Sequence, residues 1–247
     1  MSAPAEDRRY HLVDALRGLA LVNMVAMHAL YDVNVVFGGQ WRWALRPGVH
    51  VWQQYICWSF ILIAGFSFAW GGRKNLRRGL VLNLLGLAIT VVTLVFLPEE
   101  AIWFGILTFM GCAILLTLAL EKGLNRLPAG AGFALCAVLF WFFFRVNAGF
   151  LGFGLRVPAA LYRIWPLTPL GFPHSDFRSS DYFPLLPWIF LFWCGFYLKR
   201  LFDKSPACQR AAQTKIPLLS GLGRHTLWIY LLHQPLLMGI FTLIFRE

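Results

Sequence analysis

RGLVLNLLGLAITVVTLVFL, residues 78–97, decides the fold, because no residue after Arg78 in this stretch is charged. A membrane-spanning helix needs about 20 mostly apolar residues, since in lipid the backbone must satisfy its own hydrogen bonds. This stretch has that length and that composition. It therefore predicts a transmembrane helix and raises the question of how many more the chain contains.

The composition of the whole chain is that of a membrane protein. Of its 247 residues, 59% are hydrophobic and 13% are charged, whereas about a quarter of the residues in a soluble domain are charged. The net charge of +11 is typical of a polytopic protein with basic cytoplasmic loops, and we expect no nucleic-acid partner. The five cysteines form no CxxC or Cys/His spacing, so we expect no structural disulfide and no metal site.

Seven apolar runs are present, and we predict an all-α, polytopic membrane protein with a single bundle of about seven transmembrane helices. The first run is the least apolar, because it contains Asp14, Arg17, His28 and Asp32. No linker or internal repeat divides the chain, so residues 1–247 are interpreted as one domain. The predicted spans are about 13–35, 50–70, 78–97, 102–120, 129–145, 182–199 and 226–245.

The lysines and arginines predict the orientation of the bundle. With a cytoplasmic N-terminus, fifteen of them fall on the cytoplasmic side and seven on the outer side, which is the bias that membrane proteins show. We therefore expect the N-terminus inside and the C-terminus outside. The longest loop, about 146–181, then lies outside, and its many apolar residues predict that it folds back over the outer mouth of the bundle.

Two polar residues of the first span form a candidate catalytic pair. His28 and Asp32 are four residues apart and so share one face of a helix. Ionisable residues within a span usually face the bundle interior or a water-filled cavity. A carboxylate next to an imidazole fixes its tautomer and stabilises its protonated form, which suits a general base. The alternative is a pair that only forms hydrogen bonds with neighbouring helices.

Basic residues lie at the cytoplasmic ends of the predicted spans. Arg17 is on the first span, and the stretch GGRKNLRR, residues 71–78, adds Arg73, Lys74, Arg77 and Arg78. Arginine binds phosphate well through paired hydrogen bonds, so these residues are candidates for binding an anion. The alternatives are ordinary anchoring at the membrane surface for residues 71–78 and an ion pair within the helix for Arg17 and Asp14.

The last span carries a second polar group in IYLLHQPLL, residues 229–237. Pro235 removes one backbone hydrogen bond from this helix. Together with His233 and Gln234, it indicates the wall of a cavity. The alternative is a histidine whose hydrogen bonds are satisfied by a neighbouring helix.

Four stretches together resemble one family. They are RRYHLVDALRGLALVNMVAMHALYDVN (8–34), FGILTFMGCAILL (104–116), SSDYFPLLPWIFLFWCG (179–195) and LGRHTLWIYLLHQPLL (222–237). The resemblance is to the small bacterial members of the heparan-alpha-glucosaminide N-acetyltransferase catalytic-domain family, within the wider group of transmembrane acyltransferases. It runs nearly from end to end and in the same order.

This resemblance implies an acyl-CoA-dependent membrane acyltransferase. The acyl donor would be cytosolic acetyl-CoA, with no metal, and the acceptor would be a hydroxyl or amino group of a sugar or cell-envelope glycan at or beyond the outer face. The protein would lie in the inner (plasma) membrane of a bacterium, in contact with lipids, and a homodimer is compatible with the family.

The resemblance also implies roles for single residues. Arg17 would lie on the donor side, together with Arg73, Arg77 and Arg78, and His28 would be the catalytic residue, as general base or acyl carrier, oriented by Asp32. The acceptor pocket and central cavity would be lined by Asp181, Tyr182, Tyr230, His233 and Gln234.

The chain departs from the family pattern at one position, and its polar residues are also compatible with two other functions. Many relatives have a histidine where this chain has Thr108, which would alter substrate or activity if that histidine takes part in the chemistry. A transporter or flippase would use the same polar cavity without chemistry. A haem-binding electron carrier would use His28 and His233 as axial ligands, but their positions within their spans predict different depths in the membrane.

Overall fold

The computed structural model describes residues 9–39 and 41–245; Arg8 and Arg246, which enter the orientation count, lie outside the described residues. Seven helices are long and apolar enough to cross a membrane, which confirms the predicted all-α class and number of spans. The chain forms two compact units, Met1–Phe60 with Phe202–Glu247, and Ile61–Leu201. Each unit is described by itself.

The spanning helices agree with the predicted spans to within a few residues at either end. They are His11–Val36, Pro47–Trp70, Lys74–Phe96, Ile106–Leu124, Ala129–Ala148, Leu185–Phe202 and Thr226–Ile244. Large apolar side chains such as Leu84, Val95 and Phe96 remain exposed on the third of them, as expected of a helix that faces lipid. The protein is therefore a multi-pass integral membrane protein.

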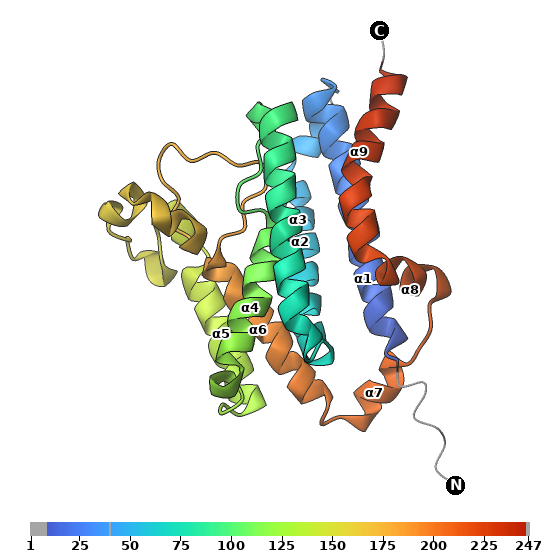
Figure 1. The fold of residues 1–247 in the computed structure, drawn as a ribbon, viewed down its shortest axis with the longest axis vertical. Helices are drawn as coiled ribbons and strands as arrows, with labels where there is room; N and C mark the ends of the chain where they lie inside the picture. Colours follow the sequence, from blue (N-terminus) through green and yellow to red (C-terminus); the bar gives the residue numbers. More distant parts are fainter. Residues whose placement is uncertain (1–8, 40, 246–247) are drawn as a thin grey trace. The chain divides into compact units, whose positions relative to one another are not determined.

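The first unit contains two of the candidate-site helices. They are α1 (His11–Tyr31) and α9 (Thr226–Ile244), and they are accompanied by residues 47–60 of α2 (Pro47–Ser67), by α7 (Pro206–Ala212) and by α8 (Pro217–Arg224). Figure 1 shows α8 alongside α1, with α9 continuing from it. α1 runs directly into a π-helical turn, Asp32–Val36. Such turns are rare and occur frequently at functional sites.

Glycines allow α8 to approach α1 closely. A Cβ atom added at Gly18 of α1 would lie 2.1 Å from the carbonyl oxygen of Leu219, and one added at Gly223 of α8 would lie 1.8 Å from that of Asp14. Ser220 strengthens the contact by donating a hydrogen bond to the carbonyl of His11, at 3.0 Å. Residues with small side chains are what close helix packing in a membrane requires.

The apolar core of the first unit joins α1 and α2 on the N-terminal side of His28 along α1. Leu21 and Met24 of α1 pack with Ile56 of α2, and Tyr230 of α9 lies against this cluster. Trp52 of α2 donates its indole N–H to the side-chain oxygen of Asn23, at 2.9 Å. The contact therefore combines burial of apolar surface with a polar tie between the two helices.

The second unit consists of the end of α2, α3 (Lys74–Phe96), α4 (Ile106–Leu124), α5 (Ala129–Phe143) and α6 (Leu185–Phe202) as far as Leu201. The predicted outer loop forms four short 3-10 turns, at Val146–Ala148, Gly152–Gly154, Ala159–Arg163 and Trp165–Leu170. Its last residues return to the segment before α4, where the backbone N–H of Ser180 donates to the carbonyl of Ala101 at 3.2 Å. Its predicted place over the mouth of the bundle stays a prediction.

Candidate functional site

The structure brings five of the predicted site residues together in the first unit. His28 and Asp32 lie at the end of α1, and Tyr230, His233 and Gln234 lie on α9. The imidazole rings of His28 and His233 are in edge-to-face contact, with their centroids 4.8 Å apart and their planes at 63°. The consecutive residues His233 and Gln234 of α9 thus contact His28 of α1 and Asp32 of the π-helical turn that follows it.

Asp32 takes a different partner from the predicted one. Gln234 donates its side-chain amide to Asp32 Oδ1 at 2.8 Å, and the second carboxylate oxygen has no hydrogen-bond partner within the described residues. The predicted hydrogen bond between Asp32 and His28 is therefore wrong for this structure. The reason is local, because the π-helical turn begins at Asp32 and the carboxylate is engaged by α9.

Three buried acceptor atoms of this cluster remain without a partner among the described residues: Asp32 Oδ2, His233 Nε2 and Gln234 Oε1. Asp32 is 0% exposed and His233 is 8% exposed. Buried polar atoms are nearly always hydrogen-bonded, and one left unpaired costs about 1–3 kcal/mol. These atoms are able to accept hydrogen bonds from a bound molecule.

The prediction that His28 and His233 lie at different depths is wrong. α8 occupies the space along the lower half of α1, so α9 starts beside the middle of α1 and not at its beginning (Figure 1). His233, although only eight residues into α9, therefore reaches the level of His28. Their edge-to-face contact leaves no room for a porphyrin between the rings, and the geometry gives the haem hypothesis no support.

Arg17 forms the ion pair that was the alternative to anion binding. It donates to Asp14 Oδ1 at 3.0 Å, while Arg9 donates to Asp14 Oδ2 at 2.9 Å. Arg17 also reaches the carbonyl of Gly223 at 3.5 Å, where the end of α8 carries partial negative charge. Arg17 thus ties α1 to α8, and its role toward a donor stays a prediction.

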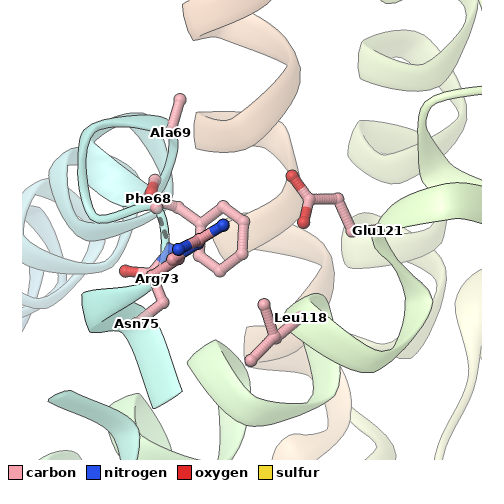
Figure 2. Close-up of a pocket in the computed structure, with 7 residues that line it drawn as sticks. Phe68, Ala69, Arg73, Asn75, Leu118 and Glu121 are labelled. Atoms are coloured by element: carbon pink, nitrogen blue, oxygen red, sulfur yellow. Dashed lines mark hydrogen bonds between the residues drawn. The ribbon is translucent and has the colours of Figure 1, made fainter. Parts of the chain in front are cut away.

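The basic stretch of residues 71–78 borders a cavity of about 250 Å³ in the second unit. Figure 2 shows Arg73, before α3, and Glu121, near the end of α4, on opposite walls, with the ring of Phe68 between them. Asn75 fixes one wall by donating to the carbonyl of Phe68 at 2.9 Å and accepting from Arg78 at 3.2 Å. Glu121 was not predicted from the sequence, because a single charged residue at a helix end is usually only solvated.

Asp181 and Tyr182 lie where the outer loop meets α4. The backbone N–H of Ile106 donates to Asp181 Oδ2 at 3.0 Å, and burial raises the pKa of Asp181 to about 6, against this hydrogen bond, which lowers it. Tyr182 donates to the carbonyl of Thr168, and burial followed by the neighbouring Tyr162 raises the pKa of its hydroxyl. Both residues therefore have structural partners, and their predicted contact with an acceptor remains untested.

Thr108 occupies a packing position between two helices. A Cβ atom added at Gly86 of α3 would lie 2.2 Å from Thr108 Oγ1 on α4. An imidazole at residue 108 would need α3 and α4 to move apart. Among the residues that the structure describes, no group of three or more His, Cys, Asp or Glu side chains is arranged to hold a metal ion.

A comparison with protein families gives a match over residues 9–235, to the family described as Heparan-alpha-glucosaminide N-acetyltransferase, catalytic. The match covers nearly the whole chain and includes all the candidate site residues discussed above. No curated protein and no solved structure matches this chain.

Proposed function

Because this chain belongs to the heparan-alpha-glucosaminide N-acetyltransferase catalytic family, we propose that it moves an acetyl or related acyl group from cytosolic acyl-CoA to a hydroxyl or amino acceptor. Family membership makes it a membrane acetyltransferase. The acceptor would be a sugar or cell-envelope glycan at or beyond the outer face. The observation that supports this best is the contact between the imidazole rings of His28 on α1 and His233 on α9, both of which lie within the matched residues.

The chemistry needs few groups from the protein. In the transfer, the thioester carbonyl carbon gains a bond to the acceptor oxygen or nitrogen, the C–S bond breaks, and the acceptor proton ends on the CoA sulfur. A thioester is already activated, so positioning supplies a large part of the rate, and a base adds about 10²–10⁴-fold. His28 is proposed as that base, or as the nucleophile that carries the acyl group between donor and acceptor.

The donor would approach along α1. Arg17 and His28 lie on the same continuous helix, eleven residues and so about 16 Å apart along its axis. A long donor fits this separation, with its phosphates near Arg17 and its acyl end near His28. Arg73, Arg77 and Arg78 are proposed as further phosphate-binding residues, although the carboxylate of Glu121 on the cavity wall disfavours a phosphate inside the cavity itself.

The acceptor would be held by polar side chains that carry no formal positive charge. Asp32 and Gln234 present the unpartnered oxygens described above, and Tyr230 lies beside His233, with ring centroids 5.6 Å apart. Oxygen acceptors of this kind complement the hydroxyl and amino donors of a sugar. Asp181 and Tyr182 of the second unit are proposed as further acceptor-binding residues.

The test is acetyl transfer by the purified protein. Detergent-solubilised protein is given acetyl-CoA carrying a radiolabelled acetyl group, with glucosamine as a probe acceptor, and both label transfer and thioester hydrolysis are followed. We expect His28→Ala to abolish both while acetyl-CoA binding, measured by calorimetry, persists. His50→Ala is the matched control, because His50 is exposed in the first turn of α2. Unchanged turnover in His28→Ala would remove the catalytic assignment.

A further inference from the structure

His233 has the arrangement of an oriented general base. Its Nδ1 lies 2.6 Å from the backbone carbonyl oxygen of Tyr230. A carbonyl oxygen can only accept a hydrogen bond, so Nδ1 carries the proton in the neutral ring and Nε2 presents a lone pair. This tautomer is assigned from the hydrogen bond, and it is the one that a histidine needs when its Nε2 takes a proton.

The lone pair of His233 Nε2 has no protein donor to satisfy it within the described residues, although the side chain is only 8% exposed. Three titratable groups lie around it. They are the imidazole of His28 on α1, in ring contact, the phenol ring of Tyr230 on α9, with its centroid 5.6 Å away, and the carboxylate of Asp32, which is held by the adjacent Gln234. A buried, unsatisfied acceptor costs stability. Its persistence next to two further unsatisfied acceptors indicates a site that a ligand N–H or O–H completes.

His28 lacks the corresponding orientation. Its predicted partner, Asp32, is engaged by Gln234, whereas His233 is oriented by the backbone carbonyl of Tyr230 in its own helix. Of the two contacting imidazoles, His233 therefore fits the base role better, and His28 fits the role of the group that meets the acyl carbon.

Building on the proposed acyl transfer, we propose that His233, through Nε2, is the base that takes the proton from the acceptor. As the acceptor oxygen or nitrogen forms its bond to the acyl carbon, its O–H or N–H bond breaks and the proton moves to Nε2. The bond from that carbon to the leaving group breaks in the same transfer, whether the leaving group is the CoA sulfur or His28. The leaving group then takes the proton, and Nδ1–H stays on the Tyr230 carbonyl throughout.

The direct test compares the pH dependence of acetyl transfer in wild type and His233→Gln. Glutamine has a similar size but cannot act as a base, so we expect kcat to fall by about 10²–10⁴-fold with acetyl-CoA affinity unchanged. The fall of kcat at low pH that protonation of the base causes in wild type (the acid limb of the pH profile) should be absent in His233→Gln. Leu232→Ala, on the exposed face of the same helix, is the matched control and should keep both kcat and the profile.

A variant that merely loosens the α1–α9 contact would also lose activity, so two further measurements decide the case. In His233→Ala, added imidazole should restore part of the lost rate, because it supplies a base to the space left by the ring. In wild type, nitrogen NMR of the labelled histidines, with the His233 signals assigned by their loss in His233→Gln, should show protonated Nδ1 and unprotonated Nε2.

The outcomes separate this inference from the proposed function. A wild-type protein that transfers no acetyl group overturns the proposed function. A wild-type protein that is active, with His233→Gln keeping its kcat and its acid limb, overturns the base role of His233 and leaves the proposed function standing. A protonated Nε2 in the NMR spectrum, or no rescue of His233→Ala by imidazole, also overturns it.

Discussion

At the scale of single residues, Asp181 shows how two opposing effects set one pKa. Burial disfavours its carboxylate and raises the pKa to about 6, while the hydrogen bond from the Ile106 N–H favours the carboxylate. The start of α4 adds partial positive charge that also favours ionisation. Burial is the larger effect, so Asp181 holds a proton in the folded protein at pH values where it has lost it in the unfolded chain.

Asp181 should therefore make stability fall as the pH rises. The unfolded carboxyl ionises near 3.8 and the folded one near 6, so its contribution declines across that window and is constant above it. Asp181→Asn keeps an oxygen that can accept from Ile106 but does not titrate. The melting temperature of this variant minus that of wild type should increase across the window, as measured by thermal unfolding in detergent.

The control for this experiment is Asp181→Ala, which loses the hydrogen bond to α4 at all pH values. Loss of a carboxylate that caps a helix start costs about 0.5–2 kcal/mol, so this variant should melt below Asp181→Asn throughout. A difference between Asp181→Asn and wild type that stays constant across the window would show that burial does not raise the pKa of Asp181.

The candidate site could be predicted from the sequence only in part. The spacing of His28 and Asp32 and the motif that contains His233 and Gln234 identify four of its members, because polar residues in apolar runs are unusual. The family resemblance adds Tyr230. Spacing within one helix predicts a shared face but gives no information on the partner across the next helix. The contacts of His28 with His233 and of Asp32 with Gln234 depend on where α9 starts relative to α1.

At the scale of the elements, the position of α8 determines where α9 begins relative to α1. The predicted spans 182–199 and 226–245 leave the residues between them without an assigned element, whereas the structure has two short helices there, α7 and α8. Signals for both were present in the sequence, because Pro206 and Pro217 stand in the first turns, where proline is favoured. Ser205 caps α7 by accepting from the N–H of Cys208 at 3.3 Å.

The contact between α1 and α8 should tolerate no added side chain at its two glycines. In Gly18→Ala or Gly223→Ala the new Cβ would meet a backbone carbonyl at 2.1 Å or 1.8 Å, and a backbone cannot rotate away. We expect each variant to lose about 1–3 kcal/mol of unfolding free energy, measured as a lower melting temperature. Activity should fall as well, because the position of α8 determines where α9 begins along α1 and so brings His233 into contact with His28.

Gly221 of the same short helix is the matched control for this prediction. A Cβ atom there meets nothing within 4 Å, and alanine is favoured over glycine in a helix by up to about 1 kcal/mol. Gly221→Ala should therefore keep or raise the melting temperature. If Gly18→Ala and Gly223→Ala behave like Gly221→Ala, the close approach of α1 and α8 is contradicted.

At the scale of the whole molecule, the sequence predicts the number and position of the spans well. A backbone in lipid has to form its own hydrogen bonds, so each long apolar run, such as residues 78–97, leads to one helix, here Lys74–Phe96. The close helix contacts are less predictable, because they depend on single small residues such as Gly86 opposite Thr108. Hydropathy does not distinguish these glycines from the many others.

The predicted orientation of the bundle can be tested with one native cysteine. Cys208 on α7 is exposed, whereas Cys57, Cys112, Cys136 and Cys194 lie within the spanning helices. The excess of lysine and arginine predicts that α7 lies in the cytoplasm. A membrane-impermeant maleimide should therefore label Cys208 only after cells are permeabilised, and Cys208→Ser should remove the label. In that background Ser175→Cys, at an exposed position of the long loop, should be labelled in intact cells. The reverse pattern would place the N-terminus outside, and cytosolic acetyl-CoA would then have to reach the site from the end of α1 opposite Arg17.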